Sequence, residues 1–440
     1  MEEYFHAIVD VLGGLVRGAE THVSSFHGEE SDFVRLNQNQ VRQAGSVTMR
    51  TLETDLISGR RHAAGSLSLS GDLAVDRSRI TDLVESLRAR RQHVPEDPFL
   101  CYATERRSTA NRRQNGLPDG AAALEEIRRL ANGRDLVGIY AAGGIYAGFA
   151  NSLGQRNWYE SYSYNFDWSL YHAADKAVTA NYAGFEWQSE ELARKMAAAI
   201  ERLEILARSP RTISPGRYRA YLAPAALGEI LGLLGWGGFG LRAHRTKTTP
   251  LLRMIEEDAK LDPRITLVEN TGDGFAPDFQ EEGFLRPERV ALIEAGGYRD
   301  CLASPRSAME FGAANNGASA GEMPHSLDVA AGEIASDEIL SRLGEGIYVG
   351  NLWYLNYSDR AACRITGLTR FATFWVKDGE LQSPLDVMRF DETIYRMLGE
   401  TLVGLSSERE LILDPSTYGQ RSTASSRLPG AMVEELTLTL

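Results

Sequence analysis

The stretch from Tyr218 to Arg242 constrains this chain most, because it reads as a short strand that runs directly into a buried helix. Residues 218–222 alternate between outward and inward positions, and Pro224 suits the first turn of a helix. Apolar residues then recur at helical spacing, and glycines end the run: Leu227, Ile230, Leu231, Leu234, Gly235, Gly237, Gly238 and Gly240. A strand that feeds a buried helix with a glycine exit is a common place to build a site.

The residues before this stretch predict an N-terminal domain, residues 1–211, of antiparallel strands and helices. Helical spacing marks four segments, residues 4–17, 76–92, 121–130 and 189–208. Alternation with polar turns predicts a strand meander between Thr21 and Ser70, strands at 136–140 and 144–151, and aromatic strands from Trp158 to Tyr171.

The residues after it predict a second domain, 217–440, that is rich in β-strands. Residues 212–216 form the expected linker, short strands and helices alternate beyond it, and Met432 to Leu440 is expected to be a final strand. The whole chain is therefore predicted to be an α+β protein.

Three pieces of sequence, in this order, resemble the TldD/PmbA family. Residues 149–154 read FANSLG, residues 281–283 (EEG) are followed by 292–296 (LIEAG), and residues 367–370 (GLTR) are followed by 377–381 (KDGEL). The family was once described as modulators of DNA gyrase and is now understood as two-subunit metalloproteases. The resemblance covers most of the chain, and the order and spacing of the pieces carry it.

In the catalytic branch of that family, the helix after the strand carries His-Glu-x-x-x-His, which supplies two zinc ligands and a general base. The matching positions here are Gly228, Glu229 and Leu233, so only the acid remains. The family's further ligand, a cysteine before Gly-Gln, is also missing, because residues 414–420 read DPSTYGQ. Catalytic zinc needs three protein ligands and an open position. The resemblance is therefore to the TldE (PmbA)-like branch, which lacks the zinc motif.

This resemblance implies the non-catalytic subunit of a heterodimeric zinc metalloprotease that acts on unfolded or leader peptides. We expect no catalytic residue and no cofactor in this chain, with zinc in a TldD-like partner and an extended peptide as substrate. Alone, the chain could form a homodimer through the surface meant for its partner. The alternative is a self-assembling peptide-binding or scaffold protein without enzymatic activity.

Charge and composition exclude other classes. With 47 basic and 60 acidic residues the net charge is -13, which disfavours nucleic acid as a partner. The three cysteines are far apart, which indicates neither disulfides nor a thiolate metal site. The N-terminus shows no secretory signal, and the apolar run at 227–241 is too short for the roughly 20 residues of a membrane span. We expect a cytoplasmic protein.

Two further features leave alternatives. Residues 317–321, GASAG, match a nucleophile elbow around Ser319, but no strand and helix flank them and no histidine can be paired with the serine from the sequence, so a flexible loop is expected. Glu229 is expected to be a solvent-facing or capping acid in the first turn of its helix. The other reading is that it still lines the cavity where the family's general base would lie.

Overall fold

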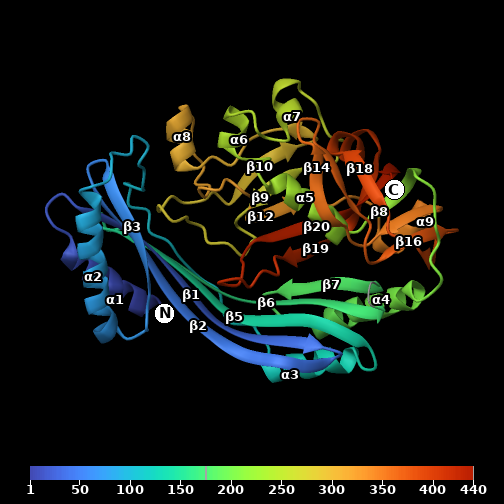
Figure 1. Ribbon diagram of the computed structural model, residues 1–440, viewed down its shortest axis with the longest axis horizontal. Helices are drawn as coiled ribbons and strands as arrows, with labels where there is room; N and C mark the ends of the chain where they lie inside the picture. The colour runs from blue at the N-terminus through green and yellow to red at the C-terminus, as the bar shows by residue number, and fades with distance from the viewer. Residues whose placement is uncertain (174–175, 440) are drawn as a thin grey trace.

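Two β-sheets and the helices packed on them make up the chain, an α+β fold in which the first sheet curves beneath the second (Figure 1). The structure is a computed structural model that describes residues 1–173 and 176–439. Strands from the first half of the chain build one sheet, and strands from the second half build the other. The predicted fold class is confirmed, whereas the division into two domains at residues 211–217 stays a prediction.

The first sheet has seven strands in the order β3-β2-β1-β5-β6-β4, with β7 also paired to β6. Their bounds are β1 (Thr21–Asn37), β2 (Gln40–Ser58), β3 (Arg61–Ser68), β4 (Ala110–Arg112), β5 (Asp135–Asn151), β6 (Arg156–Ala173) and β7 (Lys176–Gly184). Strands β1, β2 and β3 form the antiparallel meander that the alternation predicted.

Strand β5 corrects the prediction of two strands between residues 136 and 151. It is continuous and pairs with β1 on one side and β6 on the other. Gly143 has φ 152°, and a Cβ there would lie 2.1 Å from the carbonyl oxygen of Glu30. The glycine therefore allows a close approach of β1 inside the strand and does not mark a turn.

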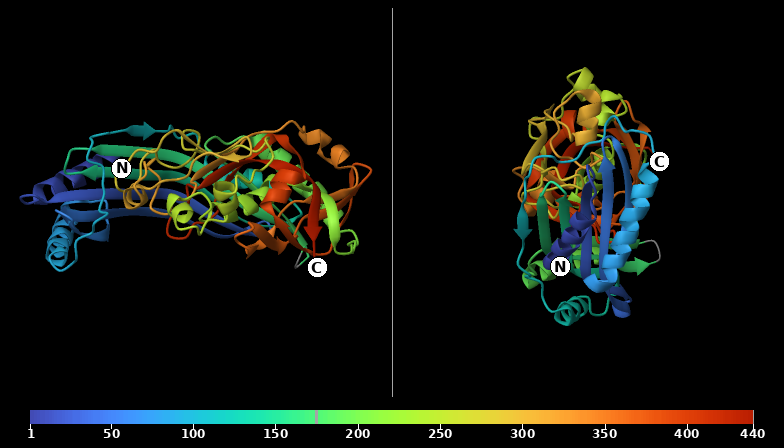
Figure 2. Two further views of the ribbon diagram at one scale, coloured as in Figure 1. Left: turned by 90° about the horizontal axis from the view of Figure 1, so that it is seen from above. Right: turned by 90° about the vertical axis from the view of Figure 1, so that its left-hand side faces the viewer.

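The helices of the first half bury the apolar faces that their spacing predicted. They are α1 (Glu2–Leu15), α2 (Leu73–Arg91), α3 (Gly120–Leu130) and α4 (Ser189–Leu206). Helices α1 and α2 share a core with the first sheet, in which Phe5 stacks on Trp158 at a centroid distance of 5.9 Å. Figure 2 shows the molecule as elongated, with α1 and α2 at one end.

The second sheet has 13 strands, and its longest path runs β11-β10-β9-β12-β20-β8-β13-β16-β17. The strands are β8 (Gly216–Leu222), β9 (Leu267–Asn270), β10 (Arg289–Glu294), β11 (Gly297–Tyr298), β12 (Ser326–Val329), β13 (Gly346–Val349), β14 (Trp353–Asp359), β15 (Arg364–Leu368), β16 (Thr373–Lys377), β17 (Glu380–Pro384), β18 (Arg389–Thr393), β19 (Leu402–Leu413) and β20 (Ser425–Leu438). The final strand thus begins seven residues earlier than predicted, and Leu440 lies outside the described residues.

The helical elements of the second half are short apart from α5. They are α5 (Pro224–Gly235), α6 (Leu241–Arg245), α7 (Leu252–Glu256), α8 (Pro305–Phe311), α9 (Ile339–Leu343), η1 (Ser336–Glu338) and η2 (Arg396–Glu400). Strand β8 leads into α5 through Pro224 at the start of the helix, as predicted. No helix in the described part of the chain is long and apolar enough to cross a membrane.

The two sheets do not have separate interiors. One buried cluster joins Phe166 and Trp168 of β6 to Tyr348 of β13 and Phe374 of β16. A second link is the buried side chain of Arg421, which reaches from the segment before β20 to Glu29 on β1. Contacts between distant parts of the sequence therefore shape the cavities between the sheets.

Candidate functional site

The face of α5 that is turned toward the first half of the chain lines a cavity of about 620 Å³. Its other walls come from β6, β7, α4, β13 and the end of β19. Gly228, Glu229 and Leu233, the three positions that match the metal motif of catalytic relatives, all lie along this cavity. Asp414 and Pro415, which begin the segment matching the missing cysteine region, line it as well. The structure thus gathers both parts of the incomplete motif around one space.

Glu229 is exposed, as predicted, but it does not lie in the first turn of its helix, so that part of the prediction is wrong. Because α5 begins at Pro224, Glu229 is its sixth residue and lies in the second turn, beyond the free amides of the helix start. Its side chain is exposed to the cavity, and the surrounding walls desolvate the carboxyl and raise its pKa. The alternative reading, in which Glu229 lines the cavity, matches this placement.

Other carboxyl groups share the cavity with Glu229. Burial raises the pKa of Asp167 on β6 to about 6. Glu410 on β19 is paired with Lys195 on α4, with 2.8 Å between carboxylate oxygen and Nζ. The cavity therefore holds carboxyl groups in two settings, one desolvated by burial and the other paired with a cation.

The donor set of this cavity does not fit zinc. Structural and catalytic zinc sites use histidine nitrogen and cysteine sulfur, with carboxylates as a minority of the ligands. Neither residue type occurs among the described residues that line the cavity. Within residues 1–173 and 176–439, no three His, Cys, Asp or Glu side chains cluster closely enough to hold a metal ion.

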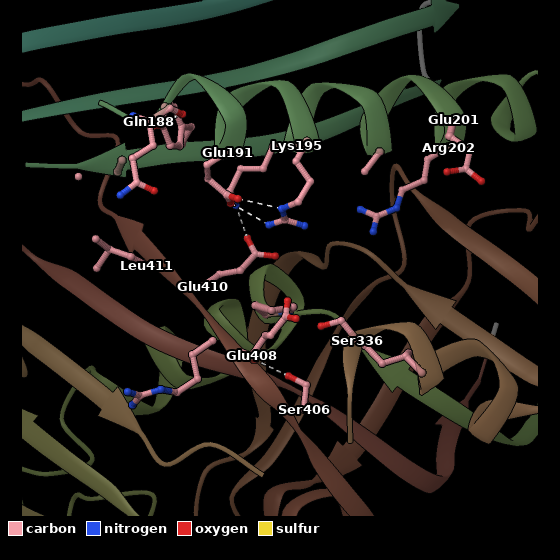
Figure 3. A pocket seen from close by; sticks show the side chains of 18 of the residues that line it. Gln188, Glu191, Lys195, Glu201, Arg202, Ser336, Ser406, Glu408, Glu410 and Leu411 are labelled. Carbon is pink, nitrogen blue, oxygen red and sulfur yellow. Dashed lines mark hydrogen bonds and ion pairs between the residues drawn. The ribbon is translucent and has the colours of Figure 1, made fainter. Parts of the chain in front are cut away.

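The cavity continues into a cleft between α4 and β19, with a volume of about 650 Å³ (Figure 3). Figure 3 shows the charged side chains of α4, among them Glu191, Lys195 and Arg202, directed toward Glu408 and Glu410 on β19. The guanidinium of Arg202 lies 5.1 Å from the ring centre of Tyr348. Seven residues line both spaces: Arg194, Lys195, Ala198, Arg202, Pro224, Tyr348 and Glu410. The two spaces therefore share walls, and the ion pair of Lys195 with Glu410 joins α4 to β19 there.

The face of α4 that lines the cleft was not predicted, although the spacing of its charged residues indicates it. The apolar positions of α4, such as Leu192, Met196 and Leu203, face the core. The charged positions recur at the same helical spacing on the opposite side, at Glu191, Arg194, Lys195, Glu201 and Arg202. Such a stripe is usually a solvated surface, and only the tertiary structure places it opposite β19.

Ser319 lies in an irregular segment between α8 and β12, so the elbow geometry is absent around it, as expected. The structure nevertheless pairs it with a histidine that could not be assigned from the sequence. Its Oγ lies 3.0 Å from Nε2 of His325 and accepts a hydrogen bond of 2.7 Å from Arg286. No sequence pattern pairs these residues, because the segment that brings them together has no periodicity.

The comparisons with known proteins agree with this geometry. The family model described as PmbA/TldA metallopeptidase C-terminal domain matches residues 215–440, which include β8, α5 and the segment 414–420. The chain therefore belongs to the PmbA/TldD family. No curated protein matches its sequence.

Solved structures extend the likeness to the whole chain. TldE from Thermococcus kodakarensis superposes with a TM-score of 0.78 at 13% identity, covering 99% of this chain and 100% of that one. A proposed modulator of a DNA gyrase from Thermotoga maritima gives 0.75 at 12% identity, with 99% and 100% covered. A similarly described protein from Bacteroides thetaiotaomicron gives 0.73 at 15% identity, with 100% and 98% covered. These likenesses establish the fold.

Proposed function

We propose that this chain is the zinc-free subunit of a two-subunit peptidase of the PmbA/TldD family, with zinc supplied by a TldD-like partner. One observation carries the proposal. The cavity at the metal-motif positions is present, but Gly228 and Leu233 stand where ligands are needed and no imidazole or thiolate lines it in the described part of the chain.

The role left to this chain is to bind and orient a peptide. The cleft along α4 and β19 offers charged side chains of both signs, which suits an unfolded or leader peptide with mixed polarity. Lys195, Arg202 and Glu410 are the groups we expect to contact it. The family relationship supports a cytoplasmic heterodimer, and we expect the isolated chain to form a homodimer when no partner is present.

The first test is metal content and complementation. We expect dialysed chain to hold less than about 0.1 zinc per molecule, because it offers no ligand set, and to cleave no unfolded peptide. Co-expression with a zinc-bearing family partner should give a complex with chelator-sensitive cleavage. The matched control is the partner with its zinc ligands replaced, which should still form the complex but not cleave.

One tightly bound zinc in the isolated chain would contradict the assignment to the zinc-free branch. Failure of any zinc-bearing family member to associate would instead favour the peptide-binding or scaffold alternative.

A further inference from the structure

A second pocket lies beside the α5 cavity, and the proposed function makes no use of it. Its volume is about 510 Å³, and its walls come from β1 and β5 of the first sheet and from three irregular segments, residues 277–286, 319–325 and 414–424. Asp414 lines both this pocket and the α5 cavity. The side chains that give the pocket its chemistry are Ser319, His325 and Arg286.

The hydrogen-bond geometry gives Ser319 a base. The distance of 3.0 Å from its Oγ to Nε2 of His325 lies within the range for a nucleophile and its general base. Arg286 donates to the same Oγ at 2.7 Å, and a guanidinium can only donate. The Oγ is therefore an acceptor toward Arg286, and its own hydrogen is available to Nε2.

Further hydrogen bonds hold the backbone at His325 and the side chain of Arg286. The backbone N–H groups of His325 and Ser326 donate to the buried carboxylate of Glu269 at 3.0–3.1 Å. Arg286 also donates to the carbonyl oxygen of Pro277 at 3.3 Å. The backbone at His325 and the guanidinium of Arg286 are thus held by different residues, Glu269 and Pro277.

The electrostatic setting keeps the imidazole neutral. Burial, and then the charge of Arg286, lower the pKa of His325 to about 4. At neutral pH its ring is therefore unprotonated, but the same effects disfavour the imidazolium and make the ring a weak base, which also limits the rate. The guanidinium of Arg286 remains charged and lies where negative charge on Oγ would develop.

We propose that Ser319 is a nucleophile and that this pocket hydrolyses carboxylic esters without a metal, with His325 as the general base and Arg286 as a positioning residue. In the first step Oγ bonds to the carbonyl carbon while its proton passes to Nε2. The bond to the leaving alcohol then breaks, and the imidazolium returns the proton to that alcohol. Water attacks the acyl-serine with the help of the same imidazole, which releases the carboxylic acid and restores the hydroxyl.

The site is a dyad. In the described residues no side chain is hydrogen-bonded to Nδ1 of His325, so nothing corresponds to the acid of a serine-protease triad. Loss of that acid from a triad lowers turnover by about 10⁴-fold. We therefore expect slow turnover, and a single covalent event is a better readout than hydrolysis.

The test uses the full chain and a fluorophosphonate probe, which phosphonylates a nucleophilic serine with loss of fluoride. We expect intact mass spectrometry to show one adduct per chain, peptide mapping to place it on Ser319, and EDTA to have no effect. S319A should lose the adduct, and H325Q should slow its formation at least about 100-fold. The control S358A removes an exposed serine of β14 that has no histidine at its Oγ and should label as the wild type does.

Thermal unfolding of each variant shows whether it is folded. A pH profile of the wild type tests the dyad without mutation: labelling should be constant from pH 6 to 8 and fall toward pH 4, where His325 becomes protonated. The proposal is overturned by absence of an adduct at 100-fold probe excess, by an adduct on another residue, by equal labelling of S319A, or by a rate that still rises between pH 6 and 8. Because none of these results involves zinc or the partner, they are independent of the proposed peptidase role.

Discussion

The α5 cavity and the Ser319 pocket lie side by side along residues 413–424, yet they hold different chemistry. The first contains carboxyl groups whose charge burial disfavours or a lysine pairs, with neither imidazole nor thiolate from the described residues. The second contains a hydroxyl, an imidazole and a guanidinium in mutual contact. The α5 cavity lies at the positions that match the family's metal motif. The Ser319 pocket includes part of the GASAG motif, which lacks the strand and helix of a nucleophile elbow.

The two pockets show that the volume of a site and its reactivity have different structural origins. The packing of the α4, α5 and β19 backbones produces a cavity of several hundred Å³. The cavity is present although Gly228 and Leu233 stand where the metal ligands of catalytic relatives would be. Reactivity depends on two or three side chains whose atoms meet within hydrogen-bond distance. Each of the following variants alters one of the two pockets or the segment that both pockets share.

The largest effect is expected at Arg421, which anchors the wall common to both cavities. Its guanidinium donates to Ser31, Ser163 and Gly143, and it pairs with Glu29, all in the interior. Arg421→Met leaves the carboxylate of Glu29 buried and unpaired, which should lower the free energy of unfolding by about 3–5 kcal/mol. Urea denaturation measures this loss of stability. Labelling of Ser319 by the fluorophosphonate and peptide cleavage after co-expression with the partner should both decrease.

The matched control is Arg107→Met, which breaks an exposed pair with Glu105 and should change the stability by less than about 0.5 kcal/mol. Adding Glu29→Gln to Arg421→Met should recover part of the loss. A loss below about 1 kcal/mol in the single variant would mean that the segment is held by other contacts.

The next largest effect is a pH dependence of the free energy of unfolding that arises in the α5 cavity alone. The folded pKa of Asp167, about 6, lies above its unfolded value of about 3.9, so the folded state binds more protons between these pH values. The contribution of Asp167 should therefore lower the stability as pH rises from 4 to 6, by at most about 3 kcal/mol. Asp167→Asn should remove this decline, which urea denaturation at several pH values measures, and should not alter labelling of Ser319.

Equal pH dependence in the wild type and in Asp167→Asn would show that the carboxyl is solvated. A change in Ser319 labelling would show that the two cavities are coupled.

The smallest effect is expected at Glu229. Because desolvation raises its pKa, the ionised form is disfavoured in the fold, and Glu229→Gln should leave the stability at neutral pH unchanged or raise it by less than about 1 kcal/mol. Cleavage by the reconstituted complex should not change, because this chain lacks the ligands that would make Glu229 a base. A loss of more than about tenfold in kcat/KM, or about 1.4 kcal/mol, with unchanged stability would mean that Glu229 takes part in the reaction.

Periodic patterns in the sequence predicted the elements that surround the cavities. The β8–α5 unit, the β1–β3 meander and the apolar faces of α1 and α4 all follow from spacings of two or 3.6 residues. Residues 136–140 and 144–151 were predicted to be two strands, whereas β5 is continuous through its glycines, because glycine serves both a turn and the close approach of a neighbouring strand. Only the partner strand β1 distinguishes the two.

The α+β class, the family resemblance and the absence of histidine at positions 228 and 233 could be predicted from the residues alone, since each depends on residue identity or on neighbours along the chain. Three features required the folded chain: Glu229 faces a cavity, the charged side of α4 faces β19, and Ser319 meets His325 and Arg286. Those contacts arise where separate segments converge. Their geometry is set by long-range packing, and no local periodicity encodes which side chains will meet.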